Sequence, residues 1–297
     1  MKCFSILRSF NQLAALHEAG ADGILLGIEG LSYRMANYPF ETAITIRQEA
    51  VSLGLDVFLF LNRLLDEDEI DEVKVFLKKH DLSCFDGIYF QDLAYVELLK
   101  DIDIPLIYAP EAIITSSQEV ASLVSCGIDR VLIAKELTLE EAEQISRNNP
   151  FRVELFGFGH LPMSVSRRPL VRNYLEEIKA DMHLSQGTGL RLKEAKRSVY
   201  FPVFEDAKET VIFADTIFCL LNELCELETN GVYSIIADDL FVDETLLTEF
   251  IASCRKVLGG ADPKIETQRL ERLAKGFTLS SGYFYKKTNL TKEGTTI

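Results

Sequence analysis

The feature that most constrains the fold is a helix–glycine–strand unit that returns along the chain. In its first copy a helix ends near Glu18-Ala19, Gly20 can adopt a positive φ as its cap, and Ile24–Leu26 begins a buried strand. The same order returns around Gly54, Gly127 and Gly231. A chain built this way is predicted to alternate strands with helices around a parallel sheet.

Eight short apolar runs fit this pattern, and near-continuous apolar runs predict strands that are covered on both faces. The expected strands are Cys3–Leu7, Ile24–Leu26, Val57–Leu61, Gly87–Phe90, Pro105–Tyr108, Arg130–Ile133, Arg152–Phe156 and Val232–Ile236. The expected outer helices include Phe40–Leu53, Asp66–Lys79, Ser117–Ser125, Leu139–Arg147, Asp215–Glu228 and Thr245–Leu258.

Eight strand–helix units favour a (β/α)8 TIM-type barrel over an open doubly wound sheet, which usually stops at five or six strands. No Gly-x-Gly-x-x-Gly motif follows the first strand, which removes the main reason to prefer a dinucleotide-binding sheet. We expect one barrel domain over residues 1–260, with a long insertion at 157–214 after the seventh strand. Residues 261–297 are expected to form a C-terminal extension packed on the barrel.

The active site of such a barrel lies at the carboxyl ends of its strands. Polar or acidic residues follow almost every expected strand: Glu29, Asn62, Gln91-Asp92, Glu111, Lys135-Glu136, Glu154 and Asp238-Asp239. Together these side chains would line one cavity. Each also has a structural alternative, because such residues begin loops and cap helices, as Thr138 is expected to do before Leu139.

Charge is distributed unevenly along the chain. The whole protein has 31 Lys and Arg against 46 Asp and Glu, a net charge of −15, which argues against general coating of nucleic acid. From His160 to Tyr200, however, eight Lys and Arg stand against four acids, a net charge of +4 that leaves −19 elsewhere. This basic part of the insertion is either a solvated loop or a surface for a specific anion, recognised through arginine.

Composition also bounds the environment of the protein. No apolar run approaches the length of about 18 residues of a membrane span, and the first residues lack the apolar core of a signal peptide. The six scattered cysteines contain no Cys-x-x-Cys pair, which predicts reduced thiols and no metal site. We therefore expect a cytoplasmic protein with no membrane partner.

The segment from Glu154 to Leu170 reads ELFGFGHLPMSVSRRPL. It resembles the signature of the peptidase U32 family, the collagenase-like proteases, in which Glu-x-Phe-x-x-Gly precedes an apolar residue, Cys, a spacer, Gly-Arg-Cys and a Ser-containing stretch. Other blocks resemble the family in the same order: Glu18–Asp22, Arg34–Asn37, Lys135–Glu141, Phe201–Val203, Cys219–Leu221 and Gly276–Tyr283.

The resemblance implies several activities, because members are named peptidases of unknown catalytic type while other branches hydroxylate RNA or ubiquinone precursors. Some members hold a four-cysteine iron–sulfur cluster and some draw on prephenate. This chain carries Pro162 and Pro169 where the first two signature cysteines are expected, and Arg167 replaces the signature glycine. Glu111 occupies the position of a Gln that is common in the family, and Ala237-Asp238-Asp239 replaces an expected Glu-Gly-Arg. Proline cannot supply a thiolate, so we expect neither the cluster nor a metal.

The resemblance and the strand ends together select the candidate site. Glu154, His160 and Glu136 are the candidate catalytic residues, with Glu154 as a general acid–base beside His160. The alternative for His160 is a loop histidine with satisfied hydrogen bonds. A small prephenate-like anion is a candidate ligand. The candidate substrate-binding residues are Arg34, Asn37, Asn62, Glu111 and Arg168.

Three functions follow from the resemblance. The first is a U32-type peptidase that cuts peptides at an acidic barrel mouth. The second is a component of prephenate-dependent 5-hydroxylation of the tRNA wobble uridine, with the basic insertion facing the tRNA. The third is a non-catalytic partner subunit of a longer U32 paralogue.

Overall fold

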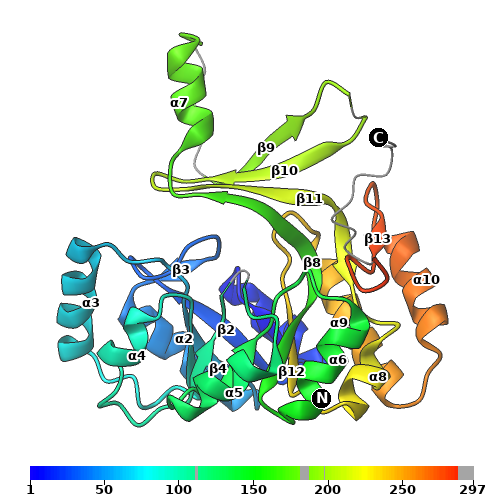
Figure 1. Cartoon of the computed structure of the whole chain (residues 1–297), viewed down its shortest axis with the longest axis horizontal. Helices are drawn as coiled ribbons and strands as arrows, with labels where there is room; N and C mark the ends of the chain where they lie inside the picture. The colour runs from blue at the N-terminus through cyan, green and yellow to red at the C-terminus, as the bar shows by residue number, and fades with distance from the viewer. Residues whose placement is uncertain (111–112, 181–186, 197, 287–297) are drawn as a thin grey trace, which may run out of the picture.

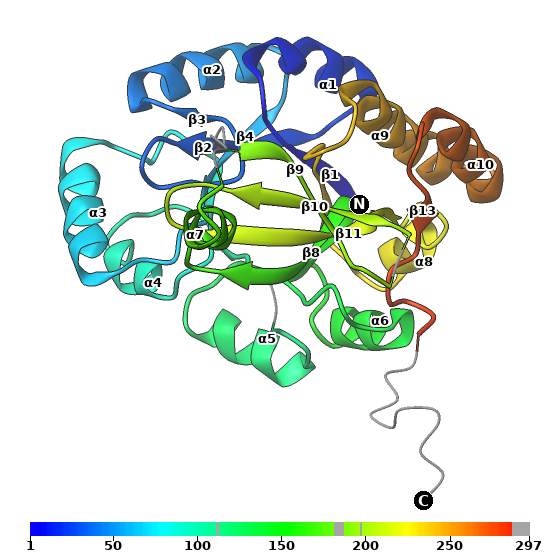
Figure 2. The same cartoon turned by 90° about the horizontal axis from the view of Figure 1, so that it is seen from above.

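The computed structural model describes residues 1–110, 113–180, 187–196 and 198–286. Eight parallel strands close into a barrel, because β12 is hydrogen-bonded to β1 on one side and to β8 on the other (Figures 1 and 2). The predicted (β/α)8 barrel is confirmed. Around the barrel the strands are β1 (Lys2–Ile6), β2 (Gly23–Ile28), β4 (Asp56–Leu61), β5 (Gly87–Phe90), β6 (Leu106–Tyr108), β7 (Arg130–Leu132), β8 (Val153–Ser166) and β12 (Ser234–Ala237).

Helices surround the barrel, as Figure 2 shows from above. Their starts follow from local sequence: Asp66, Ser116 and Thr138 each accept a hydrogen bond from the backbone of a glutamate three residues later, whose side chain returns the contact. The four glycines of the recurring unit have φ between 79° and 91°. The helices between the barrel strands are α1 (Leu13–Ala19), α2 (Phe40–Ser52), α3 (Glu67–Lys79), α4 (Ala94–Leu98), α5 (Ser117–Ser125), α6 (Leu139–Asn148) and α8 (Leu224–Thr229).

Alternation along the strands divides the apolar residues between two layers. Phe4, Leu25, Phe58, Tyr89 and Ile107 point inward and form a compact cluster inside the barrel. Their neighbours along each strand point outward and join the larger core beneath the helices. The barrel interior is therefore filled with side chains below its mouth.

The insertion is a β-sheet that grows out of the barrel wall. β8 is 14 residues long and runs ten residues beyond the short strand expected at Arg152–Phe156, because β11 (Thr210–Cys219) pairs with it in antiparallel register. β10 (Tyr200–Glu205) and β9 (Gly187–Lys193) extend this sheet, and α7 (Leu170–Glu177) projects away from it (Figure 1). The helix expected at Asp215–Glu228 is wrong over its first part, since β-branched and aromatic residues place β11 there.

Residues after the barrel pack against it. α9 (Glu244–Leu258) covers the barrel beside α1 and contacts α10 (Pro263–Leu273), whose Leu270 is buried. β13 (Leu279–Ser280) then pairs with β11, and Phe284 is buried near the start of α6. Among the described residues, no helix combines the length and apolar composition needed to cross a bilayer.

Candidate functional site

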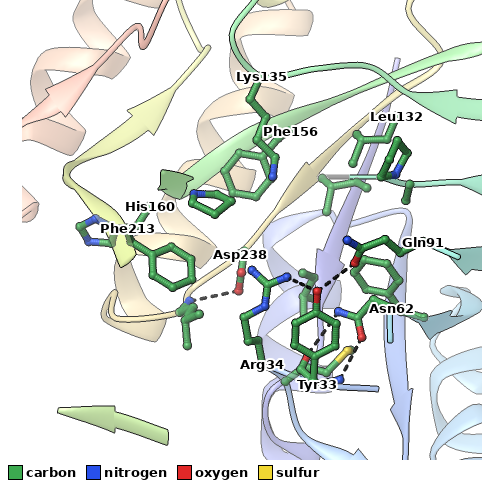
Figure 3. A pocket seen from close by; sticks show the side chains of 18 residues that line it. Tyr33, Arg34, Asn62, Gln91, Leu132, Lys135, Phe156, His160, Phe213 and Asp238 are labelled. Atoms are coloured by element: carbon green, nitrogen blue, oxygen red, sulfur yellow. Dashed lines mark hydrogen bonds between the residues drawn. The ribbon is translucent and has the colours of Figure 1, made fainter. Parts of the chain in front are cut away.

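A cavity of about 70 Å³ opens at the carboxyl ends of the barrel strands, between the barrel mouth and the insertion (Figure 3). Its walls are largely apolar, with a few cationic and amide side chains among them. This is the combination that small-molecule sites use, because the apolar walls exclude water and the polar groups orient the ligand. The lining residues are Ile6, Tyr33, Arg34, Met35, Phe60, Asn62, Gln91, Ala109, Pro110, Leu132, Lys135, Phe156, His160, Pro162, Phe213, Ile236, Asp238 and Leu240.

Two amides hold the loop after β2 in place. The Tyr33 amide donates to Oδ1 of Asn62 at 2.9 Å, and Nδ2 of Asn62 donates back to the Tyr33 carbonyl at 3.1 Å. The Tyr33 hydroxyl donates to Gln91 at 2.9 Å and accepts from Nη2 of Arg34 at 2.7 Å. Arg34 has a φ of 58°, a left-handed conformation that these surrounding contacts must impose. The result is an arginine fixed at the cavity wall.

Arg8, which follows β1, ties this loop to the residues after β12. Its Nη1 donates to the Arg34 carbonyl at 2.6 Å, and its Nε donates to Asp238 at 3.0 Å. Asp239 lies 2.9 Å from the same guanidinium and accepts from Gln12 at 2.8 Å. Burial raises the pKa of Asp239 to about 6 despite the Arg8 charge. Arg8 therefore neutralises the two carboxylates on this side of the mouth.

Lys135 enters the cavity from the segment after β7. Its Nζ lies 5.5 Å from the centre of the Phe156 ring, a cation–π contact, and the side chain is half-buried. Burial lowers the pKa of Lys135 to about 8, and the Arg34 charge acts in the same direction. Within the part of the chain that the structure describes, no side chain or carbonyl accepts a hydrogen bond from this ammonium.

His160 lies on β8 at the edge of the cavity and is only 4% exposed. Its Nδ1 is 2.7 Å from the Ala214 carbonyl, which can only accept, so Nδ1 carries the hydrogen and Nε2 has the lone pair. Burial lowers the pKa of the ring. No described residue hydrogen-bonds to Nε2. His160 is thus a neutral imidazole with a free basic nitrogen.

The turn between β10 and β11, residues 206–209, lies against the barrel mouth, and we call it the hairpin tip. Its contacts with the barrel are ion pairs: Lys208 with Glu69, Asp206 with Arg63 at 3.7 Å, and Glu209 with Arg34 at 3.6 Å. Arg167, which directly follows β8, adds a contact to Glu69 at 3.6 Å. Burial raises the pKa of Glu209 to about 7. The hairpin tip therefore covers one side of the mouth and touches an arginine of the cavity.

A family model described as Peptidase family U32 matches residues 8–293. The chain belongs to this family. The match spans both the barrel and the insertion, so the insertion is part of the family fold.

Two curated relatives are similar to this U32 chain. It is 24% identical over 289 residues to the tRNA hydroxylation protein P2 of Bacillus subtilis (strain 168), covering 92% of this chain and 94% of that protein. It is 27% identical over 172 residues to the collagenase of Porphyromonas gingivalis (strain ATCC BAA-308 / W83), covering 53% of this chain and 41% of that protein.

Some solved structures are similar to this chain, at low identity and with TM-scores below 0.5. One is a chitinase from Chromobacterium violaceum ATCC 12472, with 9% identity, a TM-score of 0.46 and coverage of 88% of this chain and 100% of that one. Another is a phosphoribosylanthranilate isomerase from Thermotoga maritima, with 10% identity, a TM-score of 0.45 and coverage of 86% and 100%.

The donor set of this U32 chain does not fit the four-cysteine cluster of some family members. Pro162 lines the cavity and Pro169 precedes α7, at the positions of the first two signature cysteines. Cys3, Cys219 and Cys254 are buried, with Cys254 beside Cys3, and Cys126 is exposed, but no cysteine lines the cavity. Among the described residues, no group of three His, Cys, Asp or Glu is arranged to hold a metal ion.

Glu154 does not reach the cavity. It is the second residue of β8, so it lies at the amino end of the barrel rather than at a strand exit as expected. There it is completely buried, accepting from the Tyr89 hydroxyl at 2.7 Å and from Nε of Arg130 at 2.6 Å. The strand end was misplaced because β8 runs ten residues beyond Phe156. Glu154 and His160 are therefore separated along one strand.

The other predicted site residues divide in the same way. Arg34, Asn62 and His160 line the cavity, whereas Glu136 is exposed beside it. Asn37 is exposed in β3 (Asn37–Tyr38) and donates to the Ser32 carbonyl at 3.0 Å. Arg168 is exposed in the insertion. Glu111 lies outside the described residues.

Sequence reasoning missed three residues of the mouth. Arg8 follows a barrel strand, so the strand-end rule would have found it. Tyr33 precedes Arg34 in a loop with no distinguishing motif. Glu209 is brought to the mouth only by the antiparallel pairing of β10 with β11.

Proposed function

We propose that this U32 chain takes part in tRNA hydroxylation and that its barrel cavity binds a small carboxylate-bearing anion in that role. The observation that carries the proposal is the similarity to tRNA hydroxylation protein P2, which extends along nearly the full length of both chains. The similarity to the collagenase covers less than half of that longer protein.

The chemistry of the cavity supports an anionic ligand. Arg34 offers a planar guanidinium, the group that pairs best with a carboxylate, and Lys135 adds a second positive charge. Phe60, Phe156 and Phe213 supply an apolar wall. A small anion with a hydrocarbon ring, such as a prephenate-like molecule, fits this combination.

The insertion supports contact with RNA. Its described cations are mostly exposed, including Arg167, Arg191 and Lys193. Tyr174 and Tyr200 are 62% and 51% exposed, and Nζ of Lys193 lies 5.1 Å from the Tyr200 ring. Cations neutralise phosphates and exposed aromatic rings stack on unpaired bases, which is how single-stranded RNA loops are bound. The rest of the chain is acidic and would repel phosphates, so contact with RNA would be confined to the insertion.

Deletion of the gene in its own host tests the proposal. Mass spectrometry of tRNA nucleosides is expected to show loss of 5-hydroxylated wobble uridine, restored by the wild-type gene and by a control variant of an exposed residue, Lys78→Met. Arg34→Gln should fail to restore it. Unchanged 5-hydroxylated uridine in the deletion strain would overturn the proposal.

A peptidase is the second candidate, favoured by the similarity to the collagenase. In that case His160, with its free Nε2, is the group at the cavity best suited to act as a base. Incubation with denatured collagen and a peptide library should then give cleavage that His160→Ala abolishes. Uncut substrates would remove this candidate.

The chain also departs from the family signature at Pro162 and Pro169. This departure favours a third role, as a non-catalytic partner subunit of a longer U32 paralogue. Affinity purification from the native host should then recover that paralogue in stoichiometric amounts. Recovery of the chain alone would reject the partner.

A further inference from the structure

The cavity contains an amine placed for covalent chemistry. Lys135 lies after β7, at the catalytic end of the barrel, and lines the cavity together with Leu132 at the end of β7 and Phe156 on the adjacent β8 (Figure 3). Its Nζ lies over the face of the Phe156 ring, and no described residue binds its ammonium by a hydrogen bond or an ion pair. Lys135 is only half-buried, so its ammonium remains accessible to a ligand in the cavity.

The environment also favours the reactive form of this amine. Apolar walls and the Arg34 charge lower the pKa of Lys135 to about 8. In about a tenth of the molecules this amine is then neutral at pH 7, whereas an ordinary lysine is neutral in well under a thousandth of them. Neutral lysine is a nucleophile toward carbonyl carbon.

Arg34 supplies the complementary group. Its guanidinium lines the same cavity and is positioned by Tyr33, which Asn62 and Gln91 hold in turn. A ligand carboxylate bound at Arg34 would leave the adjoining carbon of that ligand inside the cavity. A carbonyl on this carbon is the feature that an amine partner requires.

We propose that Lys135 forms an imine with a 2-oxo acid whose carboxylate is held by Arg34. The inference rests on the proposed anion site and deepens it by naming the ligand class and the bond formed. The lone pair of Nζ adds to the keto carbon to give a carbinolamine. The keto oxygen then leaves as water, taking with it the two protons that the neutral amine gives up. The step needs no oxidant or reductant.

Reductive trapping tests the bond directly. The purified full chain is incubated with pyruvate or phenylpyruvate and sodium cyanoborohydride, digested, and analysed by peptide mass spectrometry. The expected result is a secondary amine on Lys135, with the mass of the acid less one oxygen. The pH dependence of trapping should rise toward pH 8, where more of the amine is neutral.

Matched variants separate this site from general lysine labelling. Lys135→Arg keeps the charge but cannot form the imine, so the adduct should be lost, while Lys78→Arg on the exposed face of α3 should keep it. Arg34→Gln should bring trapping of pyruvate down to the level seen with 2-butanone, which lacks the carboxylate. Circular dichroism confirms that each variant is folded.

Two results would overturn the inference: no adduct with either acid, or an adduct spread over surface lysines and unchanged in Lys135→Arg. The experiment contains no tRNA. Failure of trapping therefore leaves the tRNA proposal standing, and unchanged tRNA in the deletion strain leaves the imine standing.

Discussion

Nε of Arg34 lies 3.6 Å from Oε1 of Glu209, so the hairpin tip of the insertion contacts an arginine that lines the barrel cavity. Lys208 and Asp206 add ion pairs to Glu69 and Arg63 on the barrel. The hairpin tip therefore contacts the barrel mouth through charged groups, while Val211 and Phe213 of β11 pack against Leu240 in a small apolar cluster behind it. Lys208 is exposed, so its contact with Glu69 is expected to be individually weak.

Breaking one contact should loosen the hairpin tip without unfolding the barrel. Glu69→Gln keeps the capping contact of α3, because glutamine also accepts from a helix start, but removes the charge that meets Lys208 and Arg167. Hydrogen exchange of amides in residues 206–210 should become about two- to fivefold faster, the effect of losing up to about 1 kcal/mol.

The matched control is Glu119→Gln, which changes the same capping position in α5 but has no contact with the insertion among the described residues. Equal acceleration in both variants would show that the effect comes from the helix cap. Hydrogen–deuterium exchange with peptide mass spectrometry reports both segments at once.

Glu209 should make stability depend on pH. Its pKa rises from an ordinary value of 4.5 to about 7 through burial, so the folded protein binds this proton more tightly than the unfolded chain does. The contribution is complete below pH 4.5 and is lost as the pH rises to about 7, lowering the free energy of unfolding by up to about 3 kcal/mol.

Urea unfolding between pH 4.5 and 8 measures this contribution. Glu209→Gln should flatten the curve over that range, whereas the exposed Glu67→Gln should follow the wild type. Asp239 is still present in the wild type and in Glu209→Gln, and its pKa rises to about 6. A smaller decrease of the free energy of unfolding with pH should therefore remain in both proteins. Identical slopes for Glu209→Gln and the wild type would assign the pH dependence elsewhere.

The barrel could be predicted from the sequence because its signals are local. The recurring glycines mark helix ends, and the apolar runs mark buried strands, so Gly87–Phe90 and Ser117–Ser125 are found with their exact bounds. The insertion was located by its length and charge, but its strands were not recognised. Their register depends on pairing between β8 and β11, whose contacting residues are about 40 to 60 positions apart in sequence.

Part of the site could also be predicted, because residues that directly follow strands can be recognised from local sequence. Arg34, Asn62 and His160 line the cavity, and Lys135 and Asp238 were identified as residues that follow strands. Glu154 was misplaced because its role depends on where β8 ends, and strand ends are the least certain part of a sequence-based assignment. Glu209 carries no local signal at all, because only tertiary pairing brings it to Arg34.

Lys135 should make anion binding depend on pH. Its ammonium attracts a carboxylate, and its pKa of about 8 means that the charge is lost as the pH rises through that value. The affinity for succinate, which has no carbonyl to react with the amine, should fall about tenfold between pH 7 and pH 9.

Isothermal titration calorimetry at the two pH values measures this change. Lys135→Met should bind more weakly at pH 7 and show little further loss at pH 9. Lys78→Met should retain the wild-type profile, since this side chain is exposed on α3. A wild-type pH profile in Lys135→Met would show that another group controls binding.

Glu154, Arg130 and Tyr89 should stabilise the amino end of the barrel as a unit. Glu154 is fully buried and Arg130 is its charged partner, so Arg130→Met leaves a carboxylate buried without its cation. The free energy of unfolding should fall by about 3–5 kcal/mol.

Arg130→Met with Glu154→Gln removes both charges and should cost less than Arg130→Met alone, a coupling that a double-mutant cycle measures. Arg152→Met, which changes an exposed arginine nearby, should cost no more than about 0.5 kcal/mol in the same urea titration. Additive losses in the double variant would instead mean that Glu154 and Arg130 contribute to the fold independently.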